Sequence, residues 1–330
     1  MTRSQWLIAS RAVRQRRAPV CWTSQRPTPF ARAGEPISTR PNSTTSSPPI
    51  SSSSSSSVSP SEVSHFSRLA STWWDPHGPS RLLHLMNPLR HDFIQSCLSS
   101  SPTDYTPSEQ SGRLSYLDIG CGGGIFASSA ARLPSTQSVT AIDPTPLVIE
   151  VAKSHQRSDP ALSPSKLQYL NCAIEDLPRY TSHTSDTSPD SGTGSSSEHK
   201  KKEKKYDIIT VFEVLEHIDS PSNFLDSALT HLKPGGWLVG STISRSPTAW
   251  FTTKLIAEAP VIGVVPAGTH DWNKYINPSE LQTYFETRAA SGRWADFRTQ
   301  GVIYVPMLGW RNVNGSEQLG NYFFGVRKVA

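Results

Sequence analysis

The stretch Leu114-Ser-Tyr-Leu-Asp-Ile-Gly-Cys-Gly-Gly-Gly-Ile-Phe-Ala-Ser-Ser-Ala-Ala-Arg-Leu133 decides the fold of this chain. Its first part, Ser115–Ile119, is a short and mostly apolar run of the kind that forms a buried strand. Residues 120–124, which we call the glycine loop, come next, and Ile125–Leu133 then has the composition of a helix. A strand, a tight glycine turn and a helix in direct succession predict the first unit of an α/β domain.

The same alternation continues outward from this unit. Strands are predicted at Ser138–Ile142, Leu167–Cys172, Tyr206–Phe212 and Trp237–Thr242, and helices at Pro146–Gln156 and Pro221–Leu232. Before the unit, two further helices are predicted at Glu62–Thr72 and Leu82–Leu98. Strands that alternate with helices at this spacing predict a doubly wound, mostly parallel sheet with right-handed crossovers.

The glycine loop distinguishes between two classes of cofactor. Dinucleotide sites use a G-x-G-x-x-G pattern, whereas Gly120, Gly122 and Gly124 follow G-x-G-x-G and position 125 is Ile. Glycine lets the backbone approach a ligand closely, and the helix N-terminus that follows favours an anionic group. A buried carboxylate at Asp118 can order the loop and receive a cationic amino-acid group. This pattern is typical of S-adenosylmethionine enzymes rather than NAD enzymes.

Two acidic residues follow the next two strands. Asp143 ends the second strand, where a carboxylate can accept hydrogen bonds from both ribose hydroxyls of a nucleotide. Its alternative role is a helix cap before Pro144. Asp176 follows the third strand, where the adenine is expected, so Asp176 or the local backbone is a candidate partner of the adenine amino group.

A third group of polar residues follows the fourth strand. Glu213, Glu216 and His217 stand at positions i, i+3 and i+4, so one helical turn would place them on one face. Two carboxylates and an imidazole can bind a divalent cation, and a catechol oxygen could complete its coordination. The alternative is that His217 packs beside the cofactor while Glu216 caps a helix or forms an ion pair.

The N-terminus differs in composition from the rest of the chain. Residues 1–40 contain eight arginines, no lysine and a single acidic residue, Glu35. An N-terminus rich in Arg and Ser and poor in acids is typical of a mitochondrial transit peptide. Because the basic excess of the chain lies here, its net charge of +5 gives no case for nucleic-acid binding. We therefore predict a transit peptide and a Ser-rich linker over residues 1–62.

The remaining composition predicts one domain over residues 63–330. Residues 181–205 are rich in Ser, Thr and Lys and are predicted to be a disordered surface insertion. No run of apolar residues approaches the length of about 20 that a membrane span requires. The four cysteines show neither a disulfide framework nor zinc-site spacing.

Several further motifs carry a resemblance to a known family. They are Trp73-Trp-Asp75, Leu83-His-Leu-Met-Asn-Pro-Leu-Arg90, Ser241-Thr-Ile-Ser-Arg245 and Val265-Pro-Ala-Gly-Thr-His-Asp-Trp272. With the glycine loop, they make the chain resemble the ubiquinone-biosynthesis O-methyltransferases from about Phe66 to Lys328. The resemblance implies a class I methyltransferase (Rossmann-like) fold with an N-terminal helical lid.

The resemblance also implies a reaction and a set of ligands. It implies cofactor contacts at Arg90, Gly120, Asp143 and Phe212, with Arg90 suited to the methionine carboxylate. It implies that Glu213, Glu216 and His217 hold a divalent metal, of which Mg²⁺ is expected, or that His217 alone acts as general base. The implied acceptors are polyprenylated catechols, namely 3,4-dihydroxy-5-polyprenylbenzoate and demethylubiquinol.

The resemblance places the protein on the matrix side of the mitochondrial inner membrane, as a peripheral protein in a complex with other ubiquinone-biosynthesis proteins. Thr248–Pro266 is apolar but interrupted by charges, so we expect a lid lying in the membrane interface or a core helix. Two alternatives remain: another quinone-pathway or small-molecule methyltransferase, and a non-catalytic scaffold subunit that retains the fold.

Overall fold

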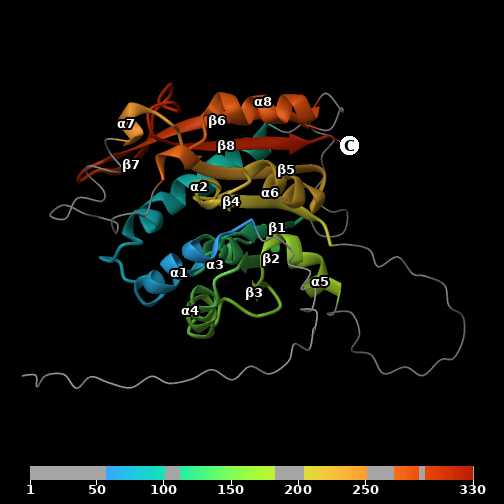
Figure 1. Ribbon diagram of the computed structural model, residues 1–330. Coiled ribbons are helices and arrows are strands. Elements are labelled where there is room, and N and C mark those ends of the chain that lie inside the picture. Colours follow the sequence, from blue (N-terminus) through green and yellow to red (C-terminus); the bar gives the residue numbers. More distant parts are fainter. Residues whose placement is uncertain (1–56, 101–111, 183–203, 251–270, 290–293, 330) are drawn as a thin grey trace, which may run out of the picture. The chain divides into compact units, whose positions relative to one another are not determined.

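The computed structural model describes residues 57–100, 112–182, 204–250, 271–289 and 294–329 (Figure 1). Within these ranges, eight strands form one sheet in the order β3-β2-β1-β4-β5-β8-β6-β7. The strands are β1 Leu114–Ile119, β2 Thr136–Asp143, β3 Leu167–Asn171, β4 Tyr206–Phe212, β5 Leu232–Ile243, β6 Trp294–Val305, β7 Gly309–Asn312 and β8 Asn321–Lys328. Strands β1 to β5 pair in parallel, and β8, β6 and β7 continue the sheet in antiparallel pairs.

Helices cover both faces of this sheet. They are α1 Pro60–Leu69, α2 Arg81–Ser99, α3 Ile125–Arg132, α4 Pro146–Arg157, α5 Leu177–Ser182, α6 Pro221–Thr230, α7 Pro247–Trp250 and α8 Pro278–Ala289. Short 3₁₀ turns are η1 Ala70–Thr72, η2 Ile174–Asp176, η3 Leu215–His217 and η5 Trp272–Lys274. Apolar residues of α2, α3 and α4 pack in one core cluster, and those of α5, α6 and α8 pack in a second cluster with the other sheet face. The domain is therefore a three-layer α/β/α sandwich.

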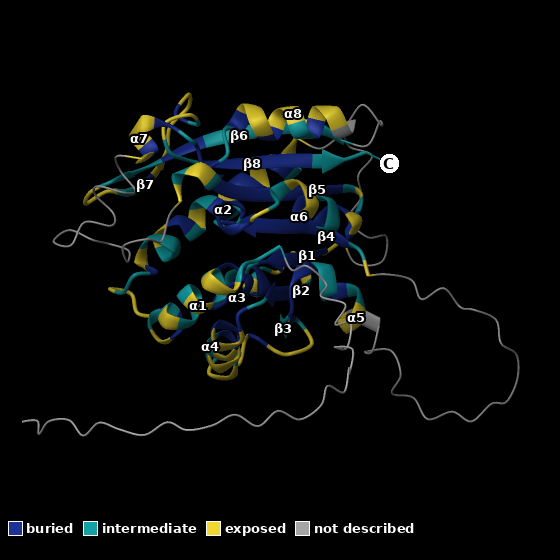
Figure 2. Ribbon diagram, in the orientation of Figure 1, coloured by how far each residue is buried: buried dark blue, intermediate teal, exposed yellow. Residues whose placement is uncertain are grey.

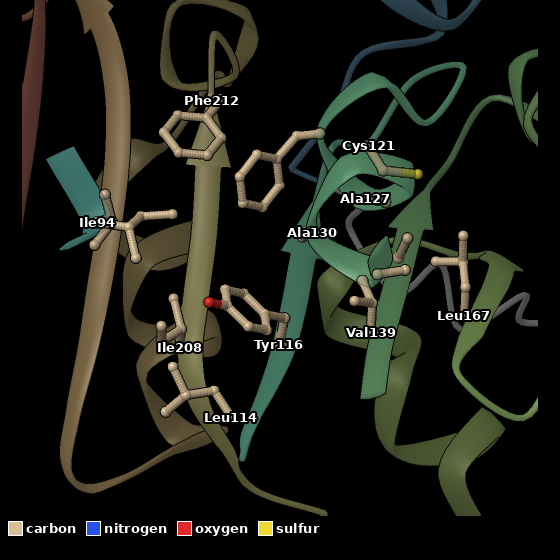
Figure 3. Packing of buried hydrophobic residues seen from close by; sticks show 14 of the residues in the cluster. Ile94, Leu114, Tyr116, Cys121, Ala127, Ala130, Val139, Leu167, Ile208 and Phe212 are labelled. Carbon is tan, nitrogen blue, oxygen red and sulfur yellow. The ribbon is translucent and has the colours of Figure 1, made fainter. Parts of the chain in front are cut away.

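The central strands are buried on both faces, as Figure 2 shows in dark blue. Every residue of β1 and of β4 is buried. Figure 3 shows Tyr116 of β1 beside Ile208 of β4, two residues that stand opposite each other in the parallel register. Burial on both sides explains why these strands have mostly apolar sequences rather than alternating ones.

The strand order places a switch point between β1 and β4. From β1 the chain continues to β2 and β3 on one side, and it then returns to β4 and β5 on the other. Crossovers that leave a switch point in opposite directions open a crevice at the carboxyl ends of the two strands, and ligands of doubly wound sheets bind there. The topology therefore predicts a ligand site at the carboxyl ends of β1 and β4.

The predicted doubly wound sheet is confirmed, and each predicted strand and helix is present with boundaries shifted by a few residues at most, apart from β5. This strand begins at Leu232 rather than Trp237, because Leu232 already pairs with Tyr206 of β4. Residues 233–236 form an irregularity of register before Trp237 pairs with Ile208. The structure also includes residues 57–62, which the sequence analysis assigned to the linker. Residues 183–203 of the predicted insertion and 251–270 of the predicted lid lie outside the described residues.

A buried carboxylate joins the start of β4 to its neighbours. Asp207 accepts hydrogen bonds from Ser115 N (2.8 Å) and Ser115 Oγ (2.6 Å) and pairs with Lys233 Nζ at 2.9 Å. Burial alone would raise the pKa of Asp207, but the hydrogen bonds from Ser115 and the charge of Lys233 outweigh it and hold the pKa below its usual range. The ionised carboxylate therefore stabilises the junction of β1, β4 and β5.

We predict that Asp207→Asn lowers the free energy of unfolding at pH 7 by roughly 2 kcal/mol or more, because a charge-assisted network is lost. Since the folded-state pKa lies below the unfolded value of about 3.9, the contribution is present above that pH and disappears as the pH falls through the folded pKa. Chemical denaturation of both proteins at pH 7 and near pH 3 measures this. An equal difference at both pH values would contradict the assignment.

Candidate active site

A cavity of about 750 Å³ opens at the carboxyl ends of β1, β2, β4 and β5. Most of the residues predicted for the site line this cavity: Arg90, Asp118, Gly120, Asp143, Phe212, Glu213, Glu216 and His217. Apolar lining residues come from α1, α2 and the hairpin of β6 and β7. A cavity lined by both charged and apolar side chains suits a ligand with a charged part and a lipophilic part.

The glycine loop takes a left-handed backbone at each of its three predicted glycines, with φ of 70° at Gly120, 51° at Gly122 and 87° at Gly124. The neighbours of the loop are protein side chains. A Cβ on Gly122 would overlap the indole of Trp73, and one on Gly124 would overlap the hydroxyl of Tyr169. A Cβ on Gly120 would likewise overlap the side chain of Val214, so protein side chains occupy the space beside all three glycines.

Two buried charged groups face the cavity from β1 and α2. Arg90 is 4% exposed, its guanidinium lies 4.9 Å from the ring centroid of Phe212, and it forms no hydrogen bond or ion pair with another described residue. Asp118 accepts a hydrogen bond from Thr210 Oγ1 (2.7 Å), while its Oδ2 is buried without a described partner. Burial raises the pKa of Asp118 to about 7. Both groups have capacity left for a ligand.

Asp143 links β2 to the glycine loop. Its Oδ2 accepts a hydrogen bond from Gly122 N (3.0 Å) and its Oδ1 accepts one from Thr145 N (2.8 Å). The side chain therefore orders both the glycine loop and the turn before α4, whose N-cap residue is Thr145. Each carboxylate oxygen of Asp143 can accept a second hydrogen bond. Burial raises the pKa of Asp143, so hydrogen-bond donors of a ligand would favour its ionised form.

The chain after β4 does not form the predicted α-helical face. Glu213 has a left-handed backbone (φ 55°), and only Leu215–His217 form a 3₁₀ turn. The predicted helical turn with Glu213, Glu216 and His217 on one face is therefore wrong, because the left-handed residue Glu213 prevents an α-helix from starting there. The kinked backbone nevertheless brings Glu213, Glu216 and His217 to the wall of the same cavity.

Hydroxyl and amide groups hold the two glutamates. Glu213 accepts hydrogen bonds from Ser241 Oγ (2.7 Å) and Asn321 Nδ2 (3.2 Å), and Glu216 accepts one from Thr242 Oγ1 (2.9 Å). Burial and then the charge of Glu213 raise the pKa of Glu216 to about 7. The pair is therefore a site of unbalanced negative charge that a bound cation would relieve.

His217 has a carboxylate partner that the sequence did not reveal. Its Nδ1 lies 3.0 Å from Oε2 of Glu62, a residue of α1. Burial alone would lower the pKa of His217, but the hydrogen bond with Glu62 and the charges of Glu216 and Glu62 raise it. Because Nδ1 is engaged, Nε2 is the nitrogen that remains for the cavity.

Two expectations find less support in the geometry. Asp176 does not line the cavity, and its carboxylate pairs instead with Arg179 at 3.3 Å. Among the described residues, no group of three or more His, Cys, Asp or Glu side chains is arranged to hold a metal ion. Glu213, Glu216 and His217 thus share a cavity wall without forming a closed ligand set.

Comparisons with known proteins agree with this geometry. A family model described as a methyltransferase domain matches residues 74–293. The chain is 38% identical over 309 residues to the protein named "Ubiquinone biosynthesis O-methyltransferase, mitochondrial" of Candida albicans, covering 83% of this chain and 86% of that protein. It is 32% identical over 255 residues to the "Ubiquinone biosynthesis O-methyltransferase" of a Methylobacterium species, covering 77% and 89%.

A solved structure supports the fold. The plantazolicin methyltransferase BpumL in complex with SAH aligns with a TM-score of 0.50 at 16% identity, covering 82% of this chain and 97% of that chain. At this identity the likeness concerns the fold alone. Together with the matched family model, it confirms the predicted class I S-adenosylmethionine-dependent methyltransferase fold.

We predict that Gly122→Val weakens binding of S-adenosylhomocysteine at least about tenfold, a cost of about 1.4 kcal/mol. The new side chain would displace Trp73 and disturb the loop that Asp143 holds. Gly112→Val is the matched control, because Gly112 has a similar φ of 61° but nothing within 4 Å of its Cβ position. Titration calorimetry measures both affinities, and equal losses would show that backbone strain alone is responsible.

Proposed function

Because the chain belongs to the family of the ubiquinone biosynthesis O-methyltransferases, we propose that it methylates catechol hydroxyls of polyprenylated ubiquinone precursors, 3,4-dihydroxy-5-polyprenylbenzoate and demethylubiquinol. The chain is an S-adenosylmethionine-dependent methyltransferase. The observation that carries the proposal is that one cavity contains Arg90, the buried Oδ2 of Asp118 without a described partner, and many apolar lining residues. The charged groups suit an amino-acid zwitterion, and the apolar residues suit an isoprenoid chain.

The methyl donor supplies an electrophilic methyl group on a sulfonium. Arg90 would bind the carboxylate of its methionine part, and Asp118 would accept a hydrogen bond from the amino group through the free Oδ2. Asp143 would accept the ribose hydroxyls while it keeps Gly122 in place. Phe212, for which a cofactor contact is expected, also supports the guanidinium of Arg90, which lies over its ring. Asp176 would reach the adenine only after leaving Arg179.

The acceptor half of the cavity lies against α1, α2 and the hairpin of β6 and β7. Its wall includes Phe66, Met86, Val302, Tyr304 and Trp310. These side chains would hold the ring of the catechol and the first isoprene units by apolar contact. Holding the acceptor oxygen in line with the methyl group would supply much of the rate acceleration, since oriented reactants avoid the entropy of encounter.

His217 is the residue that we assign to the acceptor hydroxyl. His217 lines the cavity, and Glu62 engages its Nδ1, which leaves Nε2 for the acceptor. A base at this place would take the proton of the catechol oxygen as the new bond forms. The role of His217 as general base does not depend on a metal.

A divalent metal, with Mg²⁺ expected, remains part of the proposal. Glu213, Glu216 and His217 have suitable donor atoms, and Ser241 and Thr242 orient the two carboxylates as outer partners of metal ligands do. Burial and then the charge of Glu213 raise the pKa of Glu216, and a bound cation would favour its ionised form. When bound, the ion would act as a Lewis acid on the catechol oxygen.

Because the proposed substrate is lipophilic, we expect the protein to lie against a membrane surface. The exposed apolar side chains Leu85, Trp250, Met307, Leu308 and Leu319 come from segments that also line the cavity. Residues 80–89 and 302–316 contain no acidic residue, and Arg81 and Arg311 are exposed there. An apolar rim with basic residues suits an anionic bilayer surface. No described helix is long and apolar enough to cross a membrane.

The relatives named as mitochondrial proteins support a mitochondrial location. We propose that residues 1–62 include the transit peptide, that the protein lies on the matrix side of the inner membrane, and that other ubiquinone-biosynthesis proteins bind it there. The two earlier alternatives are another quinone-pathway or small-molecule methyltransferase and a non-catalytic scaffold. Neither explains why Arg90 and the Oδ2 of Asp118 lie buried without described hydrogen-bond partners in a cavity with many apolar lining residues.

We predict that the purified protein transfers labelled methyl from S-adenosylmethionine to a hydroxyl oxygen of a short-chain prenyl catechol. Mass spectrometry of the product locates the label. A prenyl catechol with both hydroxyls already methylated is the control and should take up no label. Label on a ring carbon would support another quinone-pathway methyltransferase, and failure to bind the donor in calorimetry would support the scaffold alternative.

We predict that chelation abolishes turnover, that Mg²⁺ restores it, and that donor affinity largely survives, because the donor residues are different ones. Glu213→Ala and Glu216→Ala should each mimic the chelated enzyme, since losing one carboxylate cripples a site for a hard cation. Asp219→Ala, which removes an exposed carboxylate two residues after His217, is the control. Full activity in a preparation shown by elemental analysis to lack metal would instead support His217 acting alone.

A further inference from the structure

The hydrogen bond between Glu62 and His217 joins two residues that are 155 positions apart. Glu62 belongs to α1, which precedes the sheet in the chain, and it does not line the cavity itself. Glu62 is connected to the cavity through the imidazole of His217. The side chains are 20% exposed for Glu62 and 11% exposed for His217, so water has little access to the bond.

Several independent contacts hold α1 at this place. Val58 forms an antiparallel bridge with Ile218, and Asp219 N donates to Ser57 O at 3.2 Å. Phe66, one turn after Glu62, packs edge-on against the imidazole with ring centroids 5.0 Å apart. These contacts therefore fix the backbone on both sides of the hydrogen bond between Glu62 and His217.

The start of α1 departs from the usual chemistry of a helix terminus. Ser59 and Glu62 have the S-x-x-E spacing of a capping box, in which the glutamate turns back to the backbone N–H of the cap residue. Only half of the box is present: Glu62 N donates to Ser59 Oγ at 3.4 Å, but the Glu62 carboxylate points to His217. A local rule broken in favour of a long-range contact is typical of a functional site.

We propose that Glu62 is a positioning residue for the acceptor half of the reaction. Its carboxylate accepts a hydrogen bond from Nδ1–H of His217, which fixes both the ring orientation and the tautomer. Nε2 is then the nitrogen presented to the cavity, where it can act as base or as a ligand. This inference rests on the proposed function, but it does not depend on which of the two roles His217 has.

The test compares size-matched variants of the full chain. Glu62→Leu keeps the volume but cannot accept a hydrogen bond, and kcat should fall about 10- to 100-fold, the usual cost of losing an outer-shell partner of a histidine. Glu62→Gln can still accept from Nδ1–H through its amide oxygen and should recover most of the turnover. Calorimetry with S-adenosylhomocysteine should give unchanged donor affinity in both variants.

Ser59→Ala is the structural control. It removes the side-chain cap of α1 and leaves the carboxylate of Glu62 in place. Its turnover should match that of the wild-type protein, which separates loss of the hydrogen bond from loosening of the helix. If Ser59→Ala lowers kcat as much as Glu62→Leu does, the effect belongs to the helix and the proposal is wrong.

A double-mutant cycle keeps the proposal falsifiable if Glu62→Leu folds poorly. Because Glu62 acts through His217, Glu62→Leu should cause no further loss of turnover in a His217→Asn background. A further loss of similar size, or a fall in donor affinity that parallels the fall in kcat, would overturn it. Absence of any methyl transfer by the wild-type protein would instead contradict the proposed function, so the two failures are distinguishable.

Discussion

The conformation of the glycine loop is the constraint on which the rest of the site depends. Three left-handed residues, with φ of 70°, 51° and 87°, turn the chain sharply between β1 and α3. Asp143 fixes this turn by accepting from Gly122 N, and Trp73 packs on the face left bare by the missing side chains. A Cβ at Gly122 would separate the loop from Trp73, and the N-terminal segment would lose this support. The glycines thus hold both the cavity and the segment that carries α1.

Charge balance links the two halves of the cavity. Asp118, Asp143 and Glu216 are buried carboxylates, and burial raises the pKa of each. Arg90, whose own pKa is lowered by burial, interacts with Glu213, Asp118 and Glu216 but forms a hydrogen bond or ion pair with none of them. A cavity with this excess of carboxylates favours cationic ligands, because each bound positive group offsets a desolvation cost already present. A sulfonium, an amino group and a metal ion all meet this description.

The sequence predicted most accurately the strands and turns that depend on local residue patterns. Strands β1 to β4 were placed within two residues, because each is a short apolar run bounded by turn residues, and the glycine loop identified the cofactor class. The spacing of Glu213, Glu216 and His217 wrongly predicted a helical turn, because nothing in the residue pattern indicates the left-handed backbone of Glu213. Glu62 and Trp73 reached the site through contacts across many residues, which periodicity cannot reveal. The one local sign of Glu62 was the S-x-x-E spacing from Ser59, and a complete capping box would have given the same sign.

The attachments of the N-terminal segment differ in strength, and the difference follows from their exposure. Lys274 pairs with Asp219 at 2.8 Å, but the aspartate side chain is 59% exposed, so water and salt screen the pair. The bond between Glu62 and His217 is shielded by α1 and by the ring of Phe66. Charge-assisted hydrogen bonds strengthen as water is excluded, whereas exposed ion pairs contribute up to about 1 kcal/mol. The segment is therefore held chiefly by its shielded contacts, those of Trp73 with the glycine loop and of Glu62 with His217. Because Trp73 and His217 both line the cavity, these contacts couple the segment to the candidate site.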